Sequence, residues 1–135
     1  MTERIHKYGA LASIQLNHAG ASAYHERLGG LQSVSSSSVP SKEGNPAPRP
    51  LTKQEILNIV QKYADAAERA IGAGFDMVEI HGGHSYLLDQ FLSPLYNKRT
   101  DEFGGSYENR ARFARLVVEA VRSEEHTSEL QSLRE

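Results

Sequence analysis

Three side chains that can carry a proton lie close together in the segment VEIHGGHSYLLDQFLSP, residues 78–94. His81 and His84 are three residues apart, and Tyr86 follows two residues after the second histidine. Such groups can donate hydrogen bonds to a substrate oxygen or act as general acids, and the two histidines could also bind a metal ion. A lone histidine here would more often be a hydrogen-bonded core residue, but three proton-carrying groups at one strand end favour a functional site.

Two short, mostly apolar segments are predicted to be buried strands with polar residues at their ends. They cover residues 11–17 and 76–82. Because side chains alternate between the faces of a strand, Glu79 and His81 are expected on one face, opposite to Val78. This pattern places His81 at the carboxyl end of the second strand, with the other two proton-carrying groups on the loop that follows.

Two helices are predicted between and after these strands. The segment 51–75 has apolar residues at helical spacing, and Thr52 and Glu55 form a capping box at its start. A pair of glycines stops this helix, so its expected core is residues 52–72. The second helix is predicted over residues 107–121, with Ser106 as its N-cap.

The order of elements is therefore strand, loop, helix, strand, loop, helix. Strands joined through helices imply parallel pairing, as in open doubly wound sheets and eight-stranded barrels. Both loops that follow strands are long, residues 20–51 and 83–106, whereas the return over residues 72–76 is short. This asymmetry is typical of a (β/α)8 barrel, and the glycine-rich phosphate turn of nucleotide-binding sheets is missing from the sequence.

A complete barrel needs about 250 residues, so this chain is predicted to be part of one. The predicted fold class is α/β, a partial (β/α)8 TIM barrel formed by residues 1–121. From Arg122 the apolar period fails, and residues 122–135 resemble a translated sequencing adapter. We predict that these residues are a non-native tail, and His126 within them receives no functional role.

The composition excludes several classes of protein. Charges nearly balance, with 15 Lys plus Arg against 17 Asp plus Glu, so nothing indicates nucleic-acid binding. The sequence has no apolar run long enough to span a bilayer and no signal-peptide pattern at its start. The absence of cysteine excludes disulfides and thiolate ligands within the chain. We expect a cytoplasmic protein without nucleic-acid or membrane partners.

Three motifs resemble the Old Yellow Enzyme family: QLNHAG (15–20), GFDMVEIHGGHSYLLDQFLSP (74–94) and NKRTDEFGGSYENRARF (97–113). Members of this family are NADH:flavin oxidoreductases with an FMN-binding (β/α)8 barrel. The resemblance implies that the chain runs from the end of the second helix through the fourth helix of that barrel. It also implies FMN as cofactor, NAD(P)H as reductant and a small unsaturated carbonyl substrate. An iron–sulfur cluster is expected only in a longer parent protein.

The resemblance also implies roles for individual residues. Gln15 matches the family glutamine that hydrogen-bonds the pyrimidine edge of the flavin. His81 and His84 match the pair that binds the substrate carbonyl oxygen and stabilises its developing negative charge. Tyr86 matches the general acid that delivers a proton to the alkene carbon. The implied activity is that of an ene-reductase, which reduces the C=C bond of α,β-unsaturated carbonyl compounds.

Other features of the motifs are expected to be structural. Five residues are predicted to hold the long loop to the helix that follows it: Arg99, Asp101, Glu108, Asn109 and Arg110. Gly104 and Gly105 are expected to permit unusual backbone angles. Two departures from the family pattern stand out, since Ala21 replaces a common arginine and Ser85 replaces a common glycine.

Two alternatives stay open at this point. A metal-dependent barrel enzyme could use the His81/His84 pair, although only Glu79 offers a weak third ligand, and we predict no metal site. Alternatively, the chain is a non-functional truncated product, because half a barrel leaves strand edges unpaired and apolar helix faces uncovered. The sequence decides neither the substrate, nor the preference for NADH or NADPH, nor the oligomeric state.

Overall fold

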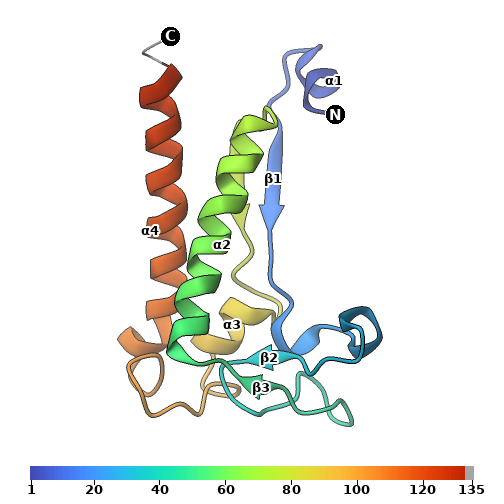
Figure 1. Ribbon diagram of the computed structural model, residues 1–135, viewed down its shortest axis with the longest axis vertical. Helices are drawn as coiled ribbons and strands as arrows, with labels where there is room; N and C mark the ends of the chain where they lie inside the picture. The colour runs from blue at the N-terminus through green and yellow to red at the C-terminus, as the bar shows by residue number, and fades with distance from the viewer. Residues whose placement is uncertain (133–135) are drawn as a thin grey trace.

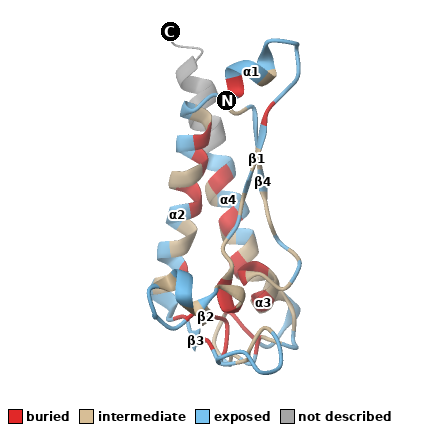
Figure 2. Ribbon diagram, turned by 90° about the vertical axis from the view of Figure 1, so that its right-hand side faces the viewer, coloured by how far each residue is buried: buried red, intermediate tan, exposed pale blue. Residues whose placement is uncertain are grey.

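Two parallel strands joined through a helix lie on one side of the molecule (Figure 1, Figure 2). The computed structural model describes the backbone of residues 1–132 and the side-chain surroundings of residues 1–123. Strands β1 (Ser13–Leu16) and β4 (Met77–Ile80) pair in parallel, and helix α2 (Lys53–Gly72) connects them. The predicted strand–helix–strand unit with parallel neighbours is therefore confirmed.

The two faces of the strand pair differ in burial. Leu16 and Val78 pack against the hydrophobic core, whereas Gln15 and Glu79, which are partners in the strand register, are exposed on the other face. Helices α2 and α4 (Tyr107–Ser132) lie along the first face only (Figure 2). The polar face carries the flavin-binding glutamine implied by the family resemblance.

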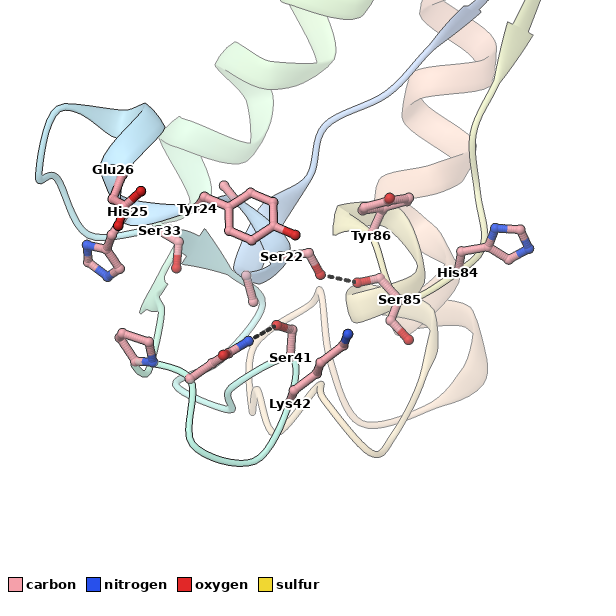
Figure 3. Close-up of a pocket in the computed structure, with 14 residues that line it drawn as sticks. Ser22, Tyr24, His25, Glu26, Ser33, Ser41, Lys42, His84, Ser85 and Tyr86 are labelled. Carbon is pink, nitrogen blue, oxygen red and sulfur yellow. Dashed lines mark hydrogen bonds between the residues drawn. The ribbon is translucent and has the colours of Figure 1, made fainter.

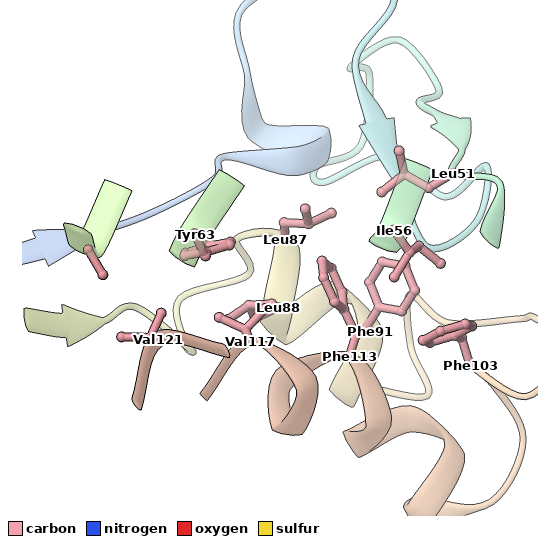
Figure 4. Close-up of a cluster of buried hydrophobic side chains, with 11 residues drawn as sticks. Leu51, Ile56, Tyr63, Leu87, Leu88, Phe91, Phe103, Phe113, Val117 and Val121 are labelled. Carbon is pink, nitrogen blue, oxygen red and sulfur yellow. The ribbon is translucent and has the colours of Figure 1, made fainter. Parts of the chain in front are cut away.

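The hydrophobic core lies where α2, α4 and the short helix α3 (Leu87–Leu92) meet (Figure 4). Phe91 and Phe113 are fully buried and meet edge to face, with ring centroids 4.8 Å apart. The remaining buried members of this cluster are Leu51, Ile56, Tyr63, Ala67, Leu87, Leu88, Phe103, Val117 and Val121. Helix α3 thus anchors the loop after β4 in the core, close to the residues of the predicted site.

Helix α2 begins with the predicted capping box. The Thr52 hydroxyl accepts a hydrogen bond from the N–H of Glu55 at 3.2 Å, and the Glu55 carboxylate accepts one from the N–H of Thr52 at 2.7 Å. The Arg49 guanidinium donates two further hydrogen bonds to this carboxylate, at 3.0 and 2.9 Å. The bonds from Arg49, and next those from Thr52, lower the pKa of Glu55 to about 2.

Helix α4 begins at the predicted residue but is longer than predicted. The Ser106 hydroxyl caps its first turn, and the helix continues to Ser132. The apolar stripe does end near Arg122, but a stripe reports packing, whereas Glu, Leu and Gln without Gly or Pro can propagate a helix that has already formed. Residues 133–135 of the predicted non-native tail lie outside the described part. Within residues 1–132, no helix is long and apolar enough to cross a membrane.

The chain begins with helix α1 (Thr2–His6) and contains short elements inside both predicted loops. The second loop contains α3, and the first contains η1 (Gly20–Ser22), η2 (His25–Leu28) and the parallel pair β2 (Val34–Ser35) and β3 (Arg49–Pro50). Four serines of the first loop are buried: Ser33, Ser35, Ser36 and Ser37. The sequence predicted an irregular loop here because the segment is rich in Gly, Ser and Pro and shows no sustained period.

Four of the five residues predicted to support the second loop do so: Arg99, Asp101, Asn109 and Arg110. Arg99 donates hydrogen bonds to the carbonyl oxygens of Ser36 at 3.0 Å and Leu51 at 2.7 Å, and it pairs with Asp101 at 2.6 Å. Asn109 and Arg110 donate to backbone carbonyls of the same loop region at 2.9 Å each. These contacts fix the loop against the core. We therefore assign these side chains a structural role and no role in the candidate chemistry.

Other structural features explain why the remaining residues of that motif occur at their positions. Gly105 has a φ of +89°, as predicted for a glycine that permits an unusual backbone angle. Gly104 is required instead by close packing, because an added Cβ would lie 2.5 Å from the Cβ of Arg99. Glu108 is exposed in the first turn of α4, where negative charge favours the helix N-terminus.

Candidate active site

The loops after β1 and β4 leave the strand pair side by side. The N–H of His81 donates to the carbonyl oxygen of Leu16 at 3.0 Å, which extends the parallel pairing by one step. Further along, the N–H of Leu87 donates to the carbonyl oxygen of His18 at 2.9 Å. The segment between these two hydrogen bonds carries His84 and Tyr86, so it is fixed at both ends against the chain that follows β1.

The three proton-carrying residues predicted from sequence come together around His81. Its ring centroid lies 5.3 Å from that of His84, with the planes at 73°, and 5.0 Å from that of Tyr86, with the planes at 85°. Both contacts are edge-to-face arrangements, a favourable geometry for aromatic rings. The structure therefore forms one cluster of two imidazoles and a phenol at the carboxyl end of β4.

The loop geometry favours one tautomer of His81. The backbone N–H of Gly83 donates to Nδ1 of His81 at 3.3 Å. In a neutral imidazole, a nitrogen that accepts a hydrogen bond leaves the proton on the other nitrogen. His81 consequently presents an Nε2–H group, which can donate a hydrogen bond to an oxygen atom of a ligand.

Two residues of this loop adopt left-handed backbone angles. His84 has a φ of +55° and Ser85 a φ of +59°, and they are the only non-glycine residues of the described chain with positive φ. This region is costly for residues with a Cβ, and such angles persist only where the surroundings enforce them. The family resemblance places a common glycine at position 85, which is consistent with the angle observed there.

A cavity of about 600 Å³ opens beside this loop (Figure 3). His84, Ser85 and Tyr86 line it from the loop after β4, and its other lining residues come from the long loop after β1: residues 21–26, Ser33, Ser41, Lys42, Asn45 and Pro46. This volume is in the usual range for a small-molecule site. Neither Gln15 nor His81 is among its lining residues, so the cavity is adjacent to the His81 cluster rather than centred on it.

The sequence predictions did not include three polar residues that line this cavity. Tyr24, His25 and Lys42 bring a phenol, an imidazole and an ammonium group to it from the loop after β1. Nothing in their local sequence marks them, because they lie in a loop without periodicity and reach the cavity only through the folding of that loop.

Gln15 lies on the exposed polar face of the strand pair. Its Nε2 donates to the Glu79 carboxylate at 3.1 Å, and within residues 1–123 its Oε1 accepts no hydrogen bond. A flavin presents alternating carbonyl and N–H groups along its pyrimidine edge, and an amide with a free acceptor and an exposed donor fits such an edge. Gln15 thus fits the cofactor that the family resemblance implies.

A second, smaller cavity of about 230 Å³ lies between the end of β1 and α2. Asn17, His18, Lys62 and Tyr63 are among its lining residues. Burial, and next the charge of Lys62, lowers the pKa of His18, and burial raises the pKa of Tyr63 to about 12. His18 accepts a hydrogen bond from the N–H of Gly20 at 3.0 Å, which is a turn contact. Neither His18 nor Tyr63 lines the larger cavity.

The alternative of a metal site gains no support from the described residues. Among them, no group of three or more His, Cys, Asp or Glu side chains is placed to hold a metal ion. Glu79, the third ligand considered for the His81/His84 pair, binds Gln15 instead.

Comparisons with known proteins show the family to which this chain belongs. The model of the NADH:flavin oxidoreductase / NADH oxidase family matches residues 1–130. The NADPH dehydrogenase of Clostridium acetobutylicum is 48% identical over 122 residues, covering 90% of this chain and 35% of that protein. The NADH oxidase of Thermoanaerobacter brockii is 44% identical over 122 residues, covering 90% of this chain and 19% of that protein.

Solved structures show the same relationship. Morphinone reductase superposes with a TM-score of 0.83 at 38% identity, over 90% of this chain and 37% of that one. A structure of morphinone reductase in complex with tetrahydroNAD has a TM-score of 0.83 at 39% identity, over 90% and 38% of the two chains. The chain therefore belongs to the NADH:flavin oxidoreductase / NADH oxidase family. It spans about a third of the length of the NADPH dehydrogenases that it matches.

Proposed function

We propose that this chain is a segment of an FMN-dependent NAD(P)H oxidoreductase that reduces the C=C bond of α,β-unsaturated carbonyl compounds. The observation that carries the proposal is the contact of His81 with both His84 and Tyr86 at the carboxyl end of β4. This cluster supplies hydrogen-bond donors and a proton within one small region. Family membership and the relatives named as NADPH dehydrogenase and NADH oxidase support the redox chemistry.

In the proposed enzyme, Gln15 holds the pyrimidine edge of FMN. FMN, when bound and reduced by the nicotinamide coenzyme, supplies the hydride. The free Oε1 of Gln15 would accept from a flavin N–H, and its Nε2 would donate to a flavin carbonyl in place of Glu79. The pairing of Gln15 with Glu79 supports this proposal, because side-chain alternation is expected to put Glu79 and His81 on the same face of the strand.

His81 and His84 are proposed to bind the carbonyl oxygen of the substrate. The Nε2–H group that the Gly83 contact favours on His81 would be one donor, and the exposed ring of His84 would provide the other. Negative charge gathers on the carbonyl oxygen when a hydride adds to the conjugated double bond. Donors already aimed at that oxygen stabilise this charge without reorganising during the reaction.

Tyr86 is proposed to deliver a proton to a carbon of the substrate C=C bond. Its ring is held by the edge-on contact with His81, and it lines the large cavity together with His84. A phenol in this place can act as a general acid toward a carbon that has become electron-rich. In this proposal, the two histidines donate hydrogen bonds to the carbonyl oxygen, and Tyr86 is the acid that protonates the carbon.

A chimera tests this proposal. Residues 1–121 of this chain would replace the matching segment of the Clostridium acetobutylicum NADPH dehydrogenase, to which the chain is 48% identical. We expect the purified chimera to contain FMN and to reduce 2-cyclohexenone with NADPH, with the unaltered dehydrogenase as the standard. A folded, FMN-containing chimera that oxidised NADPH with oxygen but left the enone unchanged would contradict the proposed substrate class.

A further inference from the structure

The backbone of Ser85 has an unusual conformation that the proposed roles of its neighbours do not explain. Ser85 stands between His84 and Tyr86 with a φ of +59°, an angle that L-residues with a Cβ rarely adopt. If this residue relaxed to negative φ, the chain direction would change between the two side chains proposed to act on the substrate. Contacts to Ser85 must therefore keep the angle in place.

Helix α3 supplies those contacts from two adjacent residues. The Asp89 carboxylate accepts a hydrogen bond from the N–H of Ser85 at 2.8 Å. The Gln90 amide donates from Nε2 to the carbonyl oxygen of Ser85 at 2.6 Å. Both polar groups of the Ser85 backbone are thus held by α3, and the Ser22 hydroxyl adds a longer bond of 3.3 Å to the same carbonyl (Figure 3).

The Gln90 side chain also reaches two other loops. It is fully buried, and its Oε1 accepts hydrogen bonds from the N–H of Ala21 at 3.0 Å and from the Ser35 hydroxyl at 2.7 Å. Its Nε2 makes a second, longer contact of 3.4 Å to the carbonyl oxygen of Ala19. One buried amide therefore joins the loop after β4 to the loop after β1, and residues of both loops line the large cavity.

The chain packs closely around the Gln90 side chain. An added Cβ at Gly20 would lie 2.3 Å from its Oε1, so the chain after β1 passes directly over the amide. The Ser36 hydroxyl, which is also fully buried, donates to the backbone carbonyl of Gln90 at 2.6 Å. A buried amide with all its hydrogen bonds made is a rigid junction, because each lost bond would leave a polar atom unsatisfied.

We propose that Asp89 and Gln90 are positioning residues, which hold the Ser85 peptide in its left-handed conformation and thereby set the placement of His84 and Tyr86. This inference rests on the proposed function, since it assigns Asp89 and Gln90 a part in that reaction. It also explains why buried serines occur in the loop after β1, where Ser35 and Ser36 complete the bonding of Gln90. The two residues touch neither substrate nor cofactor, and they act through the loop.

The test uses the chimera with Gln90→Met, which keeps the length of the side chain and removes its hydrogen bonds. Gln61→Met is the matched control, because Gln61 is exposed on α2 and hydrogen-bonds only Asp65. We expect Gln90→Met to slow enone reduction by about 10- to 100-fold, as for a catalytic group displaced by about 1 Å. FMN content and reoxidation by oxygen should be unchanged, and the control should match the parent chimera.

A second background separates positioning from a general loss of structure. In a chimera that already carries Tyr86→Phe and His84→Ala, Gln90→Met should slow the residual enone reduction by less than about threefold, because the groups that it places are gone. An equal loss in both backgrounds would overturn the proposal, as would full activity of Gln90→Met. If instead His84→Ala and Tyr86→Phe by themselves left enone reduction unchanged, the proposed function would fail rather than the positioning role.

Asp89 provides a test that disturbs the core less, because its side chain is only half-buried. Asp89→Ala removes the acceptor for the N–H of Ser85, whereas Asp89→Asn keeps an oxygen in that place. We expect the alanine variant to show the same selective loss of enone reduction and the asparagine variant to retain most of the activity. Equal activity of the two variants would contradict the proposal, even if Gln90→Met did not fold.

Discussion

The ring of His81 meets the ring of Tyr86 edge-on, with centroids 5.0 Å apart and planes at 85°. This contact joins a residue that directly follows a strand to one that directly precedes helix α3. Because His84 contacts the same imidazole, the three side chains form one cluster rather than three separate sites. Substitutions within the cluster are therefore expected to be coupled, whereas substitutions at distant positions should act independently.

The histidines should control ligand affinity. In the FMN-loaded chimera, His81→Ala and His84→Ala should each weaken binding of a phenol or an enone by about 1–3 kcal/mol, since each removes a hydrogen bond to the ligand oxygen. Titration followed by flavin absorbance measures this change. His6→Ala is the control, because His6 pairs with Asp76 at the amino end of β4, whereas the cluster lies at its carboxyl end. Unaltered affinity in His84→Ala would show that this ring does not bind the ligand.

Tyr86→Phe should separate the two half-reactions. The variant keeps the ring and removes only the acidic proton, so reduction of the flavin by the nicotinamide coenzyme should be nearly normal. Enone reduction should slow by about 100-fold or more, the usual contribution of a general acid, while reoxidation by a quinone or oxygen should be spared. Stopped-flow measurement of both half-reactions checks this. Slowed flavin reduction with intact enone reduction would refute the role of Tyr86.

The capping box of α2 should make stability depend on pH in the acid range. The pKa of Glu55 is lowered from 4.5 to about 2, so its carboxylate stabilises the fold fully above pH 4.5, and this contribution is lost as the pH falls toward 2. Glu55→Gln should therefore lower the urea midpoint of the chimera at pH 7, and this difference should narrow below pH 4.5.

Glu68→Gln is the matched control for that measurement, because Glu68 lies on the same helix and forms no hydrogen bond or ion pair within residues 1–123. Its midpoint should follow that of the parent chimera at every pH. A difference between Glu55→Gln and the parent that stayed constant from pH 7 to pH 2 would contradict the pairing of Glu55 with Arg49 in solution.

Two glycines with similar backbone angles should tolerate alanine differently. Gly20 has a φ of +58° and Gly29 a φ of +63°, but an added Cβ would meet Gln90 at 2.3 Å in the first case and open space in the second. Gly29→Ala should cost about 1–2 kcal/mol from the left-handed angle alone. Gly20→Ala should cost about 1–3 kcal/mol more through overpacking, as measured by urea unfolding of the chimera. Equal costs would mean that Gln90 does not occupy its observed place in solution.

The 135-residue chain alone should bind FMN weakly or not at all. It spans about a third of the length of the NADPH dehydrogenases that it matches, and the phosphate site of a (β/α)8 barrel is commonly built by the loops after strands 7 and 8. Equilibrium dialysis against FMN, compared with the chimera, measures the difference. Stoichiometric flavin that copurified with the isolated chain would contradict the assignment of this chain to the second through fourth helices of the barrel.

Local sequence determined several parts of this protein. The capping box of Thr52 and Glu55 predicted the start of α2, and the alternation around Glu79 predicted which face of β4 is polar. The strand–helix–strand order predicted the parallel pair β1–β4. Each of these features depends on residues within a few positions of one another or on a periodic pattern, so the amino-acid sequence itself contains the information needed to predict it.

Contacts between distant segments decided the rest. Gln90 is bonded to Ala21 and Ser35, which lie 69 and 55 positions away, and no local pattern marks a glutamine that will be buried and fully hydrogen-bonded. We infer that the same side chain, together with Asp89 and Ser22, stabilises the left-handed angle of Ser85 through hydrogen bonds to its backbone. The sequence alone thus predicted which residues are proposed to carry the chemistry, and the tertiary structure decided how they are held, since positions depend on packing partners that are remote in the chain.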